Sequence, residues 1–216
     1  MNGSARRDFI VANTKLMPVP LVPEVNLHLA HEAVPLWQKT EEELGEMGLP
    51  PPFWAFAWAG GQALARYALD NPLVVRGKTV IDLASGSGLV GIAAMRAGAH
   101  CVLAADIDHF AMEAIRLNAE SNVVAIATTA DDLLQAPPPA ADVILVGDLF
   151  YERGLAERLL AWLQRAKANG TDVLIGDPGR SYLPRQTLVA TASYQVPVTR
   201  DLEDTEIKNT SVWRLA

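Results

Sequence analysis

Short apolar runs alternate with longer amphipathic segments along most of the chain, from about residue 54 to residue 176. The apolar runs contain mainly valine, isoleucine, leucine and alanine, which is typical of strands buried on both faces of a sheet. In the longer segments apolar residues recur every three or four positions, which predicts helices with one buried face. The predicted strands cover residues 79–83, 101–105, 123–128, 142–146 and 172–175, and the predicted helices cover residues 54–69, 89–97, 111–122 and 155–168.

The order of these elements predicts a mostly parallel sheet with helices on both of its faces. Strands that alternate with helices form strand–helix–strand units, whose strands pair in parallel. Two more apolar runs, at residues 194–198 and 210–215, have no helical segment between them. We expect them to form an antiparallel hairpin at one edge. The predicted fold class is therefore α/β, with a Rossmann-like sheet of seven strands.

Residues 1–52 do not follow this pattern. Four prolines at positions 18, 20, 23 and 35 interrupt an otherwise apolar segment, and a charged stretch that begins at Thr40 ends at three prolines, residues 50–52. We expect a helical and irregular N-terminal arm over residues 1–52, followed by the main domain over residues 53–216. The arm packs on that domain, or serves as a lid or docking surface for a substrate; the two roles are compatible.

The composition fits one ordinary domain with an extension. The chain has 216 residues, of which 50% are hydrophobic and 20% are charged, so it can bury a sizeable core. Its 18 basic and 25 acidic residues give a net charge of −7. A binder of nucleic acid would need a surplus of clustered lysine and arginine, so we expect no nucleic-acid partner.

The few cysteines and histidines restrict the chemistry further. Cys101 is the only cysteine, which excludes an internal disulfide and favours a reducing compartment. The four histidines lack the spacing of metal ligands, so we expect no metal site. No segment has the pattern of a signal peptide or a membrane span. We expect a cytoplasmic protein that does not bind membranes and acts as a monomer.

A glycine-rich turn follows the first predicted strand of the sheet. Residues 86–91 read Gly-Ser-Gly-Leu-Val-Gly and match the G-x-G-x-x-G pattern between a strand and a helix. Glycines such as Gly86 and Gly88 allow a sharp turn and the close approach of a ligand. Asp106 ends the next strand, about 20 residues after Gly86, where a carboxylate accepts hydrogen bonds from ribose hydroxyls. These residues predict a site for a nucleoside cofactor.

Two cofactors fit a glycine turn of this kind, a nicotinamide dinucleotide and S-adenosylmethionine. Asp82 lies in the strand, four residues before Gly86. A carboxylate there would repel a pyrophosphate but would attract the α-ammonium group of S-adenosylmethionine. The chain after Asp106 is also too short for the second half-sheet and substrate domain of a dehydrogenase. We therefore favour S-adenosylmethionine.

Several segments resemble the motifs of seven-stranded methyltransferases. Residues 80–88 resemble their first motif, with Ala84 in the place of its usual first glycine. Residues 106–108 look like the ribose motif, which implies that Ile107 also lies beside the cofactor. Residues 131–133, Asp-Asp-Leu, fall where this superfamily places an acid near the adenine amine, and either Asp131 or Asp132 fills that role.

The resemblance extends to a narrower family. Asp148-Leu149-Phe150-Tyr151 is similar to the D-x-x-Y signature of the protein lysine methyltransferase branch. Residues 53–61, 176–180 and 206–213 resemble the lysine methyltransferases that act on the β subunit of electron transfer flavoprotein. The resemblance covers most of residues 53–216 and implies a protein substrate. The alternatives are a ribosomal-protein lysine methyltransferase, a small-molecule methyltransferase and a non-catalytic cofactor-binding module.

Methyl transfer to lysine needs a neutral amine, whereas free lysine has a pKa of about 10.4. Asp148, at the end of a predicted central strand, is placed to hold the ammonium group and accept its proton. It also has a purely structural reading, as the cap of the helix before Leu155. Tyr151 would hydrogen-bond or pack against the lysine stem. Trp58 precedes a glycine pair and is either a wall of the cofactor pocket or part of the core.

Overall fold

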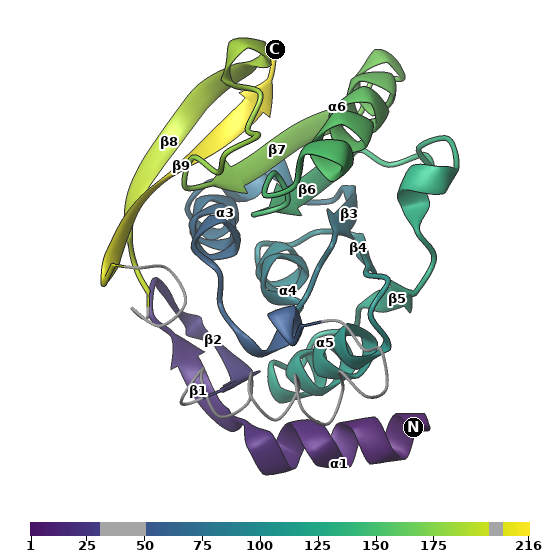
Figure 1. Cartoon of the computed structure of the whole chain (residues 1–216), viewed down its shortest axis with the longest axis vertical. Helices are drawn as coiled ribbons and strands as arrows, with labels where there is room; N and C mark the ends of the chain where they lie inside the picture. The colour runs from purple at the N-terminus through teal and green to yellow at the C-terminus, as the bar shows by residue number, and fades with distance from the viewer. Residues whose placement is uncertain (31–50, 199–204) are drawn as a thin grey trace.

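The computed structural model describes residues 1–30, 51–198 and 205–216 (Figure 1). Seven strands form one sheet in the order β5-β4-β3-β6-β7-β9-β8. The first five in this order are parallel, and β9 runs antiparallel to both of its neighbours, which confirms the predicted fold class. The strands are β3 (Thr79–Leu83), β4 (Cys101–Ala105), β5 (Ala127–Thr129), β6 (Val143–Gly147), β7 (Asp172–Asp177), β8 (Leu188–Pro197) and β9 (Ile207–Leu215).

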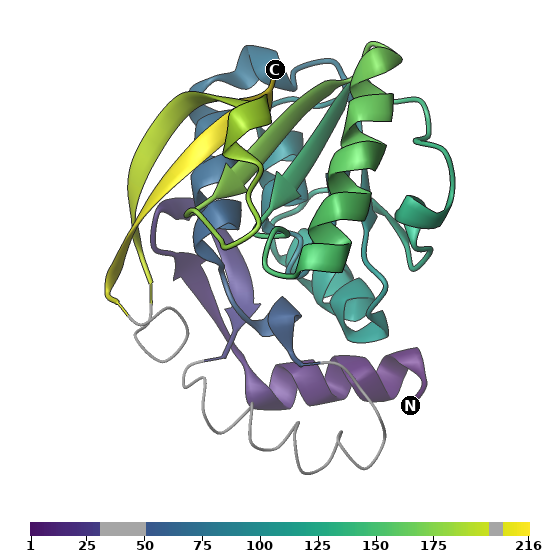
Figure 2. The same ribbon diagram turned by 45° about the horizontal axis from the view of Figure 1, so that its top comes forward.

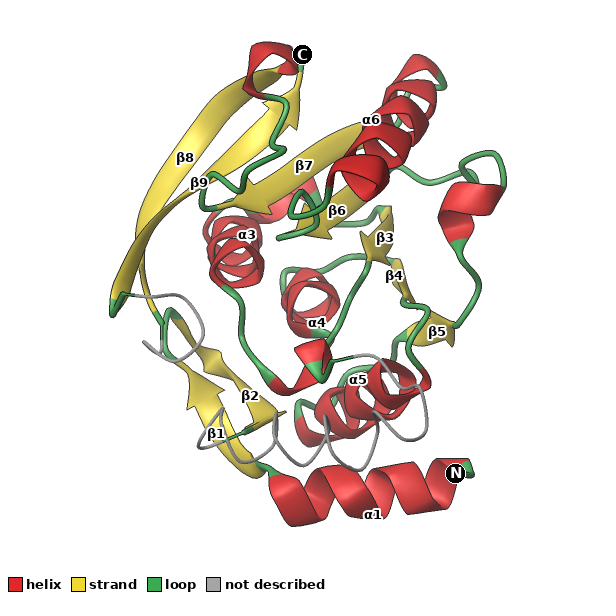
Figure 3. Cartoon of the chain, in the orientation of Figure 1, coloured by secondary structure: helices red, strands yellow, loops and turns green. Residues whose placement is uncertain are grey.

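Helices cover both faces of the sheet, as Figures 2 and 3 show. Alternate strand residues point to opposite faces: Ile81 and Ile144 pack with the helix on one face, and Val80 and Leu145 pack with those on the other. All four side chains are buried, so the apolar runs are strands covered on both sides. One face carries α3 (Ala59–Asp70), α4 (Leu89–Arg96) and α5 (His109–Ser121), and the other carries α6 (Arg153–Ala168).

Several element boundaries differ from the prediction; the strand expected at residues 194–198, for example, begins at Leu188. The helix expected from residue 54 begins at Ala59, because the chain first forms a short 3-10 turn, η1 (Phe53–Ala55). The strand expected over residues 123–128 is limited to Ala127–Thr129, because Val123 has a φ of 55° and turns the chain away from the end of α5. A positive φ is unusual for a β-branched residue, so the pattern of apolar residues gave no sign of this turn.

The expectation of a helical and irregular N-terminal arm is wrong for residues 15–29. After α1 (Gly3–Asn13), the strands β1 (Lys15–Val19) and β2 (Val22–Leu29) form an antiparallel hairpin. The prolines do not prevent it, because the register shifts between Pro18 and Val19 and a two-stranded ribbon leaves edges that need no donor. Buried side chains of the hairpin pack on α4, among them Val25 and Leu27. The charged stretch after Thr40 lies outside the described residues.

Two asparagines of α5 attach the hairpin to the main domain. The Asn122 side chain accepts a hydrogen bond from the Asn26 amide (3.0 Å) and donates one to the Asn26 carbonyl (2.6 Å). Asn118 accepts from the His28 amide (2.7 Å) and donates to the Ser87 carbonyl (2.8 Å). The two side chains thus form hydrogen bonds with the backbone of β2 that a neighbouring strand would otherwise form. Asn118 also connects the hairpin to the glycine turn.

Two glycines bring the amino end of α3 against the carboxyl ends of the central strands. A Cβ atom on Gly60 would lie 2.1 Å from the Gly176 carbonyl oxygen, and one on Gly176 would lie 2.1 Å from the Gly60 oxygen. No side chain other than hydrogen fits either position.

Among the helices in the described ranges, none combines the length and apolar composition needed to cross a bilayer.

Candidate active site

A cavity of about 480 Å³ opens at the carboxyl ends of β3, β4 and β6. It lies where the chain order of the parallel strands reverses, which is the usual ligand position in such sheets. Its volume is typical of a site for a small molecule. Nine of the ten site residues expected from the sequence line it: Trp58, Asp82, Gly86, Asp106, Ile107, Asp131, Asp132, Asp148 and Tyr151.

Gly88, the tenth, has a packing role in the structure. It caps α4 with a φ of 84°, and a Cβ atom there would meet three atoms of Ile115 at 3.4 Å. The glycine therefore lets α4 lie close to α5. It is absent from the described lining of the cavity, in contrast to Gly86.

Asp82 holds the glycine turn from below. Its Oδ2 atom accepts hydrogen bonds from the Ser85 hydroxyl (2.5 Å) and the Gly91 amide (2.8 Å), so it ties the turn to the first residues of α4. The side chain is almost fully buried, and this burial raises the pKa of its carboxyl to about 6. Ala84, in the place of the family's glycine, adopts a φ of 53°, a conformation that glycine would adopt without strain.

Asp106 joins the same turn from the end of β4. Its Oδ2 accepts a hydrogen bond from the Gly86 amide (2.9 Å) and its Oδ1 accepts one from the Asp108 amide (3.0 Å). Burial raises its pKa. Each carboxylate oxygen retains acceptor capacity, so both remain able to bind ribose hydroxyls. The exposed Ile107 side chain lies at the rim of the cavity beside it.

Three further acids line the adjoining wall. Asp108 caps α5 through the Phe110 amide (2.8 Å), and burial, with the nearby Asp106 charge, raises its pKa to about 6. Asp132 caps the 3-10 turn η3 (Leu133–Gln135) in the same way. Asp131 accepts a hydrogen bond from the Thr129 hydroxyl (2.7 Å). These bonds fix the orientation of all three side chains.

Asp148 lies directly after β6 with a φ of 58°. Its Oδ2 accepts the Gly61 amide of α3 (2.8 Å), and its Oδ1 accepts Nη2 (2.7 Å) and Nε (3.2 Å) of Arg180. Burial raises the pKa of Asp148 to about 6, while the Arg180 charge opposes the rise. The reading of Asp148 as the cap of the following helix is wrong, because α6 begins after Glu152 and the carboxylate caps α3 instead.

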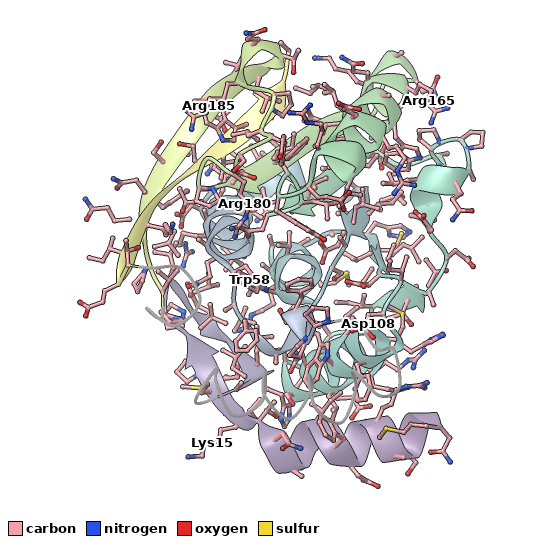
Figure 4. The ribbon with its side chains drawn as sticks, in the orientation of Figure 1. Lys15, Trp58, Asp108, Arg165, Arg180 and Arg185 are labelled. Atoms are coloured by element: carbon pink, nitrogen blue, oxygen red, sulfur yellow. The ribbon has the colours of Figure 1, made fainter. Side chains whose placement is uncertain are left out.

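Arg180 also lines the cavity, although the sequence reasoning assigned it no role. Its backbone is held by Asp177, whose Oδ1 accepts the amides of Gly179 and Arg180, each at 2.7 Å. Its guanidinium carbon lies 5.6 Å from the centre of the Trp58 ring (Figure 4), within the range of a cation–π contact. The sequence does show a basic residue just after the end of a strand. It does not show that this residue pairs with Asp148, which lies 32 residues earlier in the chain.

Aromatic side chains form the wall next to Asp148. The Phe53 ring lies 5.8 Å from the Trp58 ring and 6.1 Å from the Tyr151 ring, measured between centres. Trp58 donates a hydrogen bond to the Phe53 carbonyl (2.9 Å), which fixes its indole. Tyr151 remains half-exposed, and partial burial raises its pKa. Trp58 thus lines the cavity, and its role as a wall of the cofactor pocket stays a prediction.

The sheet order, the glycine turn and the acids at the strand ends define a methyltransferase of the seven-stranded class. The model of the ribosomal protein L11 methyltransferase (PrmA) family matches residues 62–149. A solved ribosomal protein L11 methylase from Lactobacillus delbrueckii subsp. bulgaricus shares this fold (TM-score 0.51, 24% identity, 74% of this chain and 81% of that chain).

Two relatives match almost the whole chain. The electron transfer flavoprotein beta subunit lysine methyltransferase of Danio rerio is 39% identical over 96% of this chain and 82% of that protein. The protein of the same name from Xenopus laevis is 40% identical over 98% of this chain and 87% of that protein. The chain belongs to this family and is a protein lysine methyltransferase.

Proposed function

We propose that this protein transfers methyl groups from S-adenosylmethionine to lysine side chains of the β subunit of electron transfer flavoprotein. The substrate follows from the names of the relatives, which match nearly the whole chain. The observation that carries the chemistry is the buried Asp148 carboxylate, which lies beside an aromatic wall in the same cavity as the glycine turn.

The residues at the glycine turn fit this cofactor. Gly86 has a φ of 54°, and among the described residues other than its chain neighbours the nearest atom to where its Cβ would be lies at 3.9 Å, so the turn leaves room for a ligand. Asp106 would hold the ribose, Asp131 or Asp132 the adenine amine, and Asp82 the α-ammonium group. Ile107 and Trp58 would form the apolar walls. When bound, S-adenosylmethionine supplies an electrophilic methyl group on a sulfonium.

Asp148 and Tyr151 would serve the acceptor. With a pKa of about 6, Asp148 is ionised at neutral pH and is able to accept a hydrogen bond, and then a proton, from the lysine ammonium group. Tyr151 would pack along the lysine stem together with Phe53. The half-exposed position of Tyr151 supports a contact with a side chain that enters from solvent.

A ribosomal protein is the second candidate substrate, because the L11 methyltransferase model matches residues 62–149.

We further propose that residues 1–52 are an accessory arm of the domain over residues 53–216, and that the protein acts as a cytoplasmic monomer. The single cysteine supports a reducing compartment.

Replacing Asp148 by asparagine tests the catalytic role. We expect single-turnover methylation of the flavoprotein β subunit to fall by about 10²–10⁴, while the affinity for S-adenosylmethionine changes little. Asp142→Asn, at the opposite end of the same strand, is the control, since it also accepts a backbone amide there. A folded Asp148→Asn protein that methylates within about threefold of wild type would contradict the role. Offering ribosomal protein L11 in parallel decides between the two substrates.

A further inference from the structure

The guanidinium group of Arg180 contacts both the Asp148 carboxylate and the aromatic wall of the cavity. Arg180 donates two hydrogen bonds to Oδ1 of Asp148 and lies against the Trp58 ring. Its side chain is 20% exposed and that of Asp148 is 9% exposed, so water screens the pair weakly. All three residues line the cavity, and the positive charge therefore faces the space that an acceptor must enter.

The local chain is built to hold this arginine in place. Asp177, whose side chain is fully buried, accepts the amides of Gly179 and Arg180 and thereby closes a tight turn after β7. Gly179 has a φ of 98°, which a residue with a side chain rarely adopts. A turn fixed in this way directs the guanidinium across the strand ends toward Asp148.

We infer that Arg180 is a positioning residue for the acceptor: its guanidinium orients the Asp148 carboxylate and places a permanent positive charge beside the acceptor nitrogen, so that the pocket favours lysine as the neutral amine. This inference deepens the proposed function and rests on it. It assigns to a residue outside the D-x-x-Y signature a part in removing the proton from the acceptor.

The acceptor lysine must lose a proton before it reacts, and this explains how the Arg180 guanidinium, in addition to the sulfonium of the cofactor, would help. Free lysine has a pKa of about 10.4, whereas Asp148 has one of about 6, so transfer of a proton from the ammonium group to the carboxylate is unfavourable. The Arg180 charge lowers the pKa of a nearby amine and that of Asp148 as well, so it favours loss of the proton to solvent, with Asp148 as a relay. In the step itself an N–H bond of the ammonium group breaks and an O–H bond forms on Asp148. The proton then passes to solvent, and the amine keeps its lone pair.

The other charged groups that the structure describes around Asp148 do not supply this effect. Among the described residues, Asp177 is the second charge acting on Asp148, and it raises the pKa of that carboxyl. On the cofactor side the cavity is lined by Asp82, Asp106 and Asp108. The far wall carries Asp131, Asp132 and Arg158, and Arg158 lies 4.0 Å from Asp132. Tyr151, on the loop of Asp148, is neutral at physiological pH because its pKa is raised.

Three variants test the inference through the pH dependence of single-turnover methylation. Arg180→Met removes the charge, Arg180→Lys keeps it, and Arg185→Met removes a charge from the same connecting segment, at a position farther from Trp58 than Arg180 is (Figure 4). Loss of the Arg180 charge raises the pKa of both the acceptor lysine and Asp148, so both changes move the onset of activity to higher pH.

We expect Arg180→Met to be about 10–100-fold slower than wild type at pH 7 and to recover to within about threefold near pH 9. Arg180→Lys and Arg185→Met should keep the wild-type profile. A loss that is equal at every pH would assign Arg180 to folding alone and overturn the inference. An unchanged profile would overturn it as well.

A titration of the Asp148 carboxyl carbon by nuclear magnetic resonance gives a readout without substrate or cofactor. We expect the Asp148 pKa to be higher in Arg180→Met than in wild type by about one unit or more, and unchanged in Arg185→Met. An unchanged Asp148 titration in Arg180→Met would overturn the inference about Arg180. Failure of wild-type protein to methylate any lysine would instead overturn the proposed function, so the two failures are distinguishable.

Discussion

Two acids of the pocket, Asp106 and Asp148, each accept a backbone amide that belongs to another element. Asp106 accepts amides from the glycine turn and from its own loop, and Asp148 accepts one from α3. The sequence predicted which acids gather at the strand ends, because the carboxyl ends of parallel strands meet at one edge. It did not predict the partners of Asp148, since Gly61 and Arg180 approach it through tertiary packing alone.

Asp106→Ala should weaken binding of S-adenosylmethionine at least tenfold. The variant loses charge-assisted hydrogen bonds to the ribose worth about 1.5–3 kcal/mol. It also leaves the Gly86 amide without its acceptor, so the apo protein should melt at a lower temperature. Asp106→Asn keeps an acceptor oxygen, so its affinity for S-adenosylmethionine and its melting temperature should lie between those of wild type and Asp106→Ala. Calorimetry measures the affinity, and an unchanged dissociation constant, or tight binding of a nicotinamide dinucleotide, would rule out this role.

At the scale of elements, the strands were the most predictable part of the fold. The predicted strands at 79–83 and 101–105 match β3 and β4 residue for residue, because a run of apolar residues between polar ones marks a doubly covered strand. The β1–β2 hairpin was missed because its prolines suggested irregular chain. The side chains that pair with it, Asn118 and Asn122, lie on a helix far along the sequence.

The contact between α3 and β7 gives a matched pair of glycine variants. In Gly60→Ala the new methyl group would meet the Gly176 carbonyl at 2.1 Å and Oδ2 of Asp148 at 2.6 Å. We expect a loss of about 1–3 kcal/mol in the free energy of unfolding, and slower methylation because Asp148 must move. In Gly61→Ala the nearest atoms, on Val90 and Leu89, lie at 3.9 and 4.0 Å.

Gly61→Ala should therefore be neutral or stabilising by up to about 1 kcal/mol, since alanine favours a helix. Chemical denaturation of both variants and wild type measures the difference. Equal stability of the two variants would show that α3 is able to move away from β7 at little cost.

At the scale of the whole molecule, the N-terminal hairpin and the glycine turn share one side chain. Asn118 is fully buried and bonds to His28 in the hairpin and to Ser87 in the turn. The hairpin thus supports the glycine turn of the proposed cofactor site through α5, and the first 30 residues form part of the structural framework. The described part of the arm packs on the domain, as one of its two readings expected.

Asn118→Ala should lower the free energy of unfolding by about 2–4 kcal/mol, because it leaves the part-buried His28 amide and the buried Ser87 carbonyl without this partner. It should also weaken binding of S-adenosylmethionine, since Ser87 lines the cavity. Ser121→Ala, on the exposed face of the same helix, is the control. Thermal unfolding and calorimetry on the same samples would refute the connection if stability fell and cofactor affinity did not.

The backbone conformation at Asp148 restricts which residues can replace it during evolution. With a φ of 58°, the site readily accepts glycine, asparagine or aspartate, and disfavours larger or branched side chains. Of these three, only aspartate carries a charge. Of the two uncharged residues, asparagine also keeps an acceptor oxygen for the Gly61 amide, so a lineage that drifts to asparagine here would keep this backbone and lose the proposed chemistry, and it would become a pseudoenzyme.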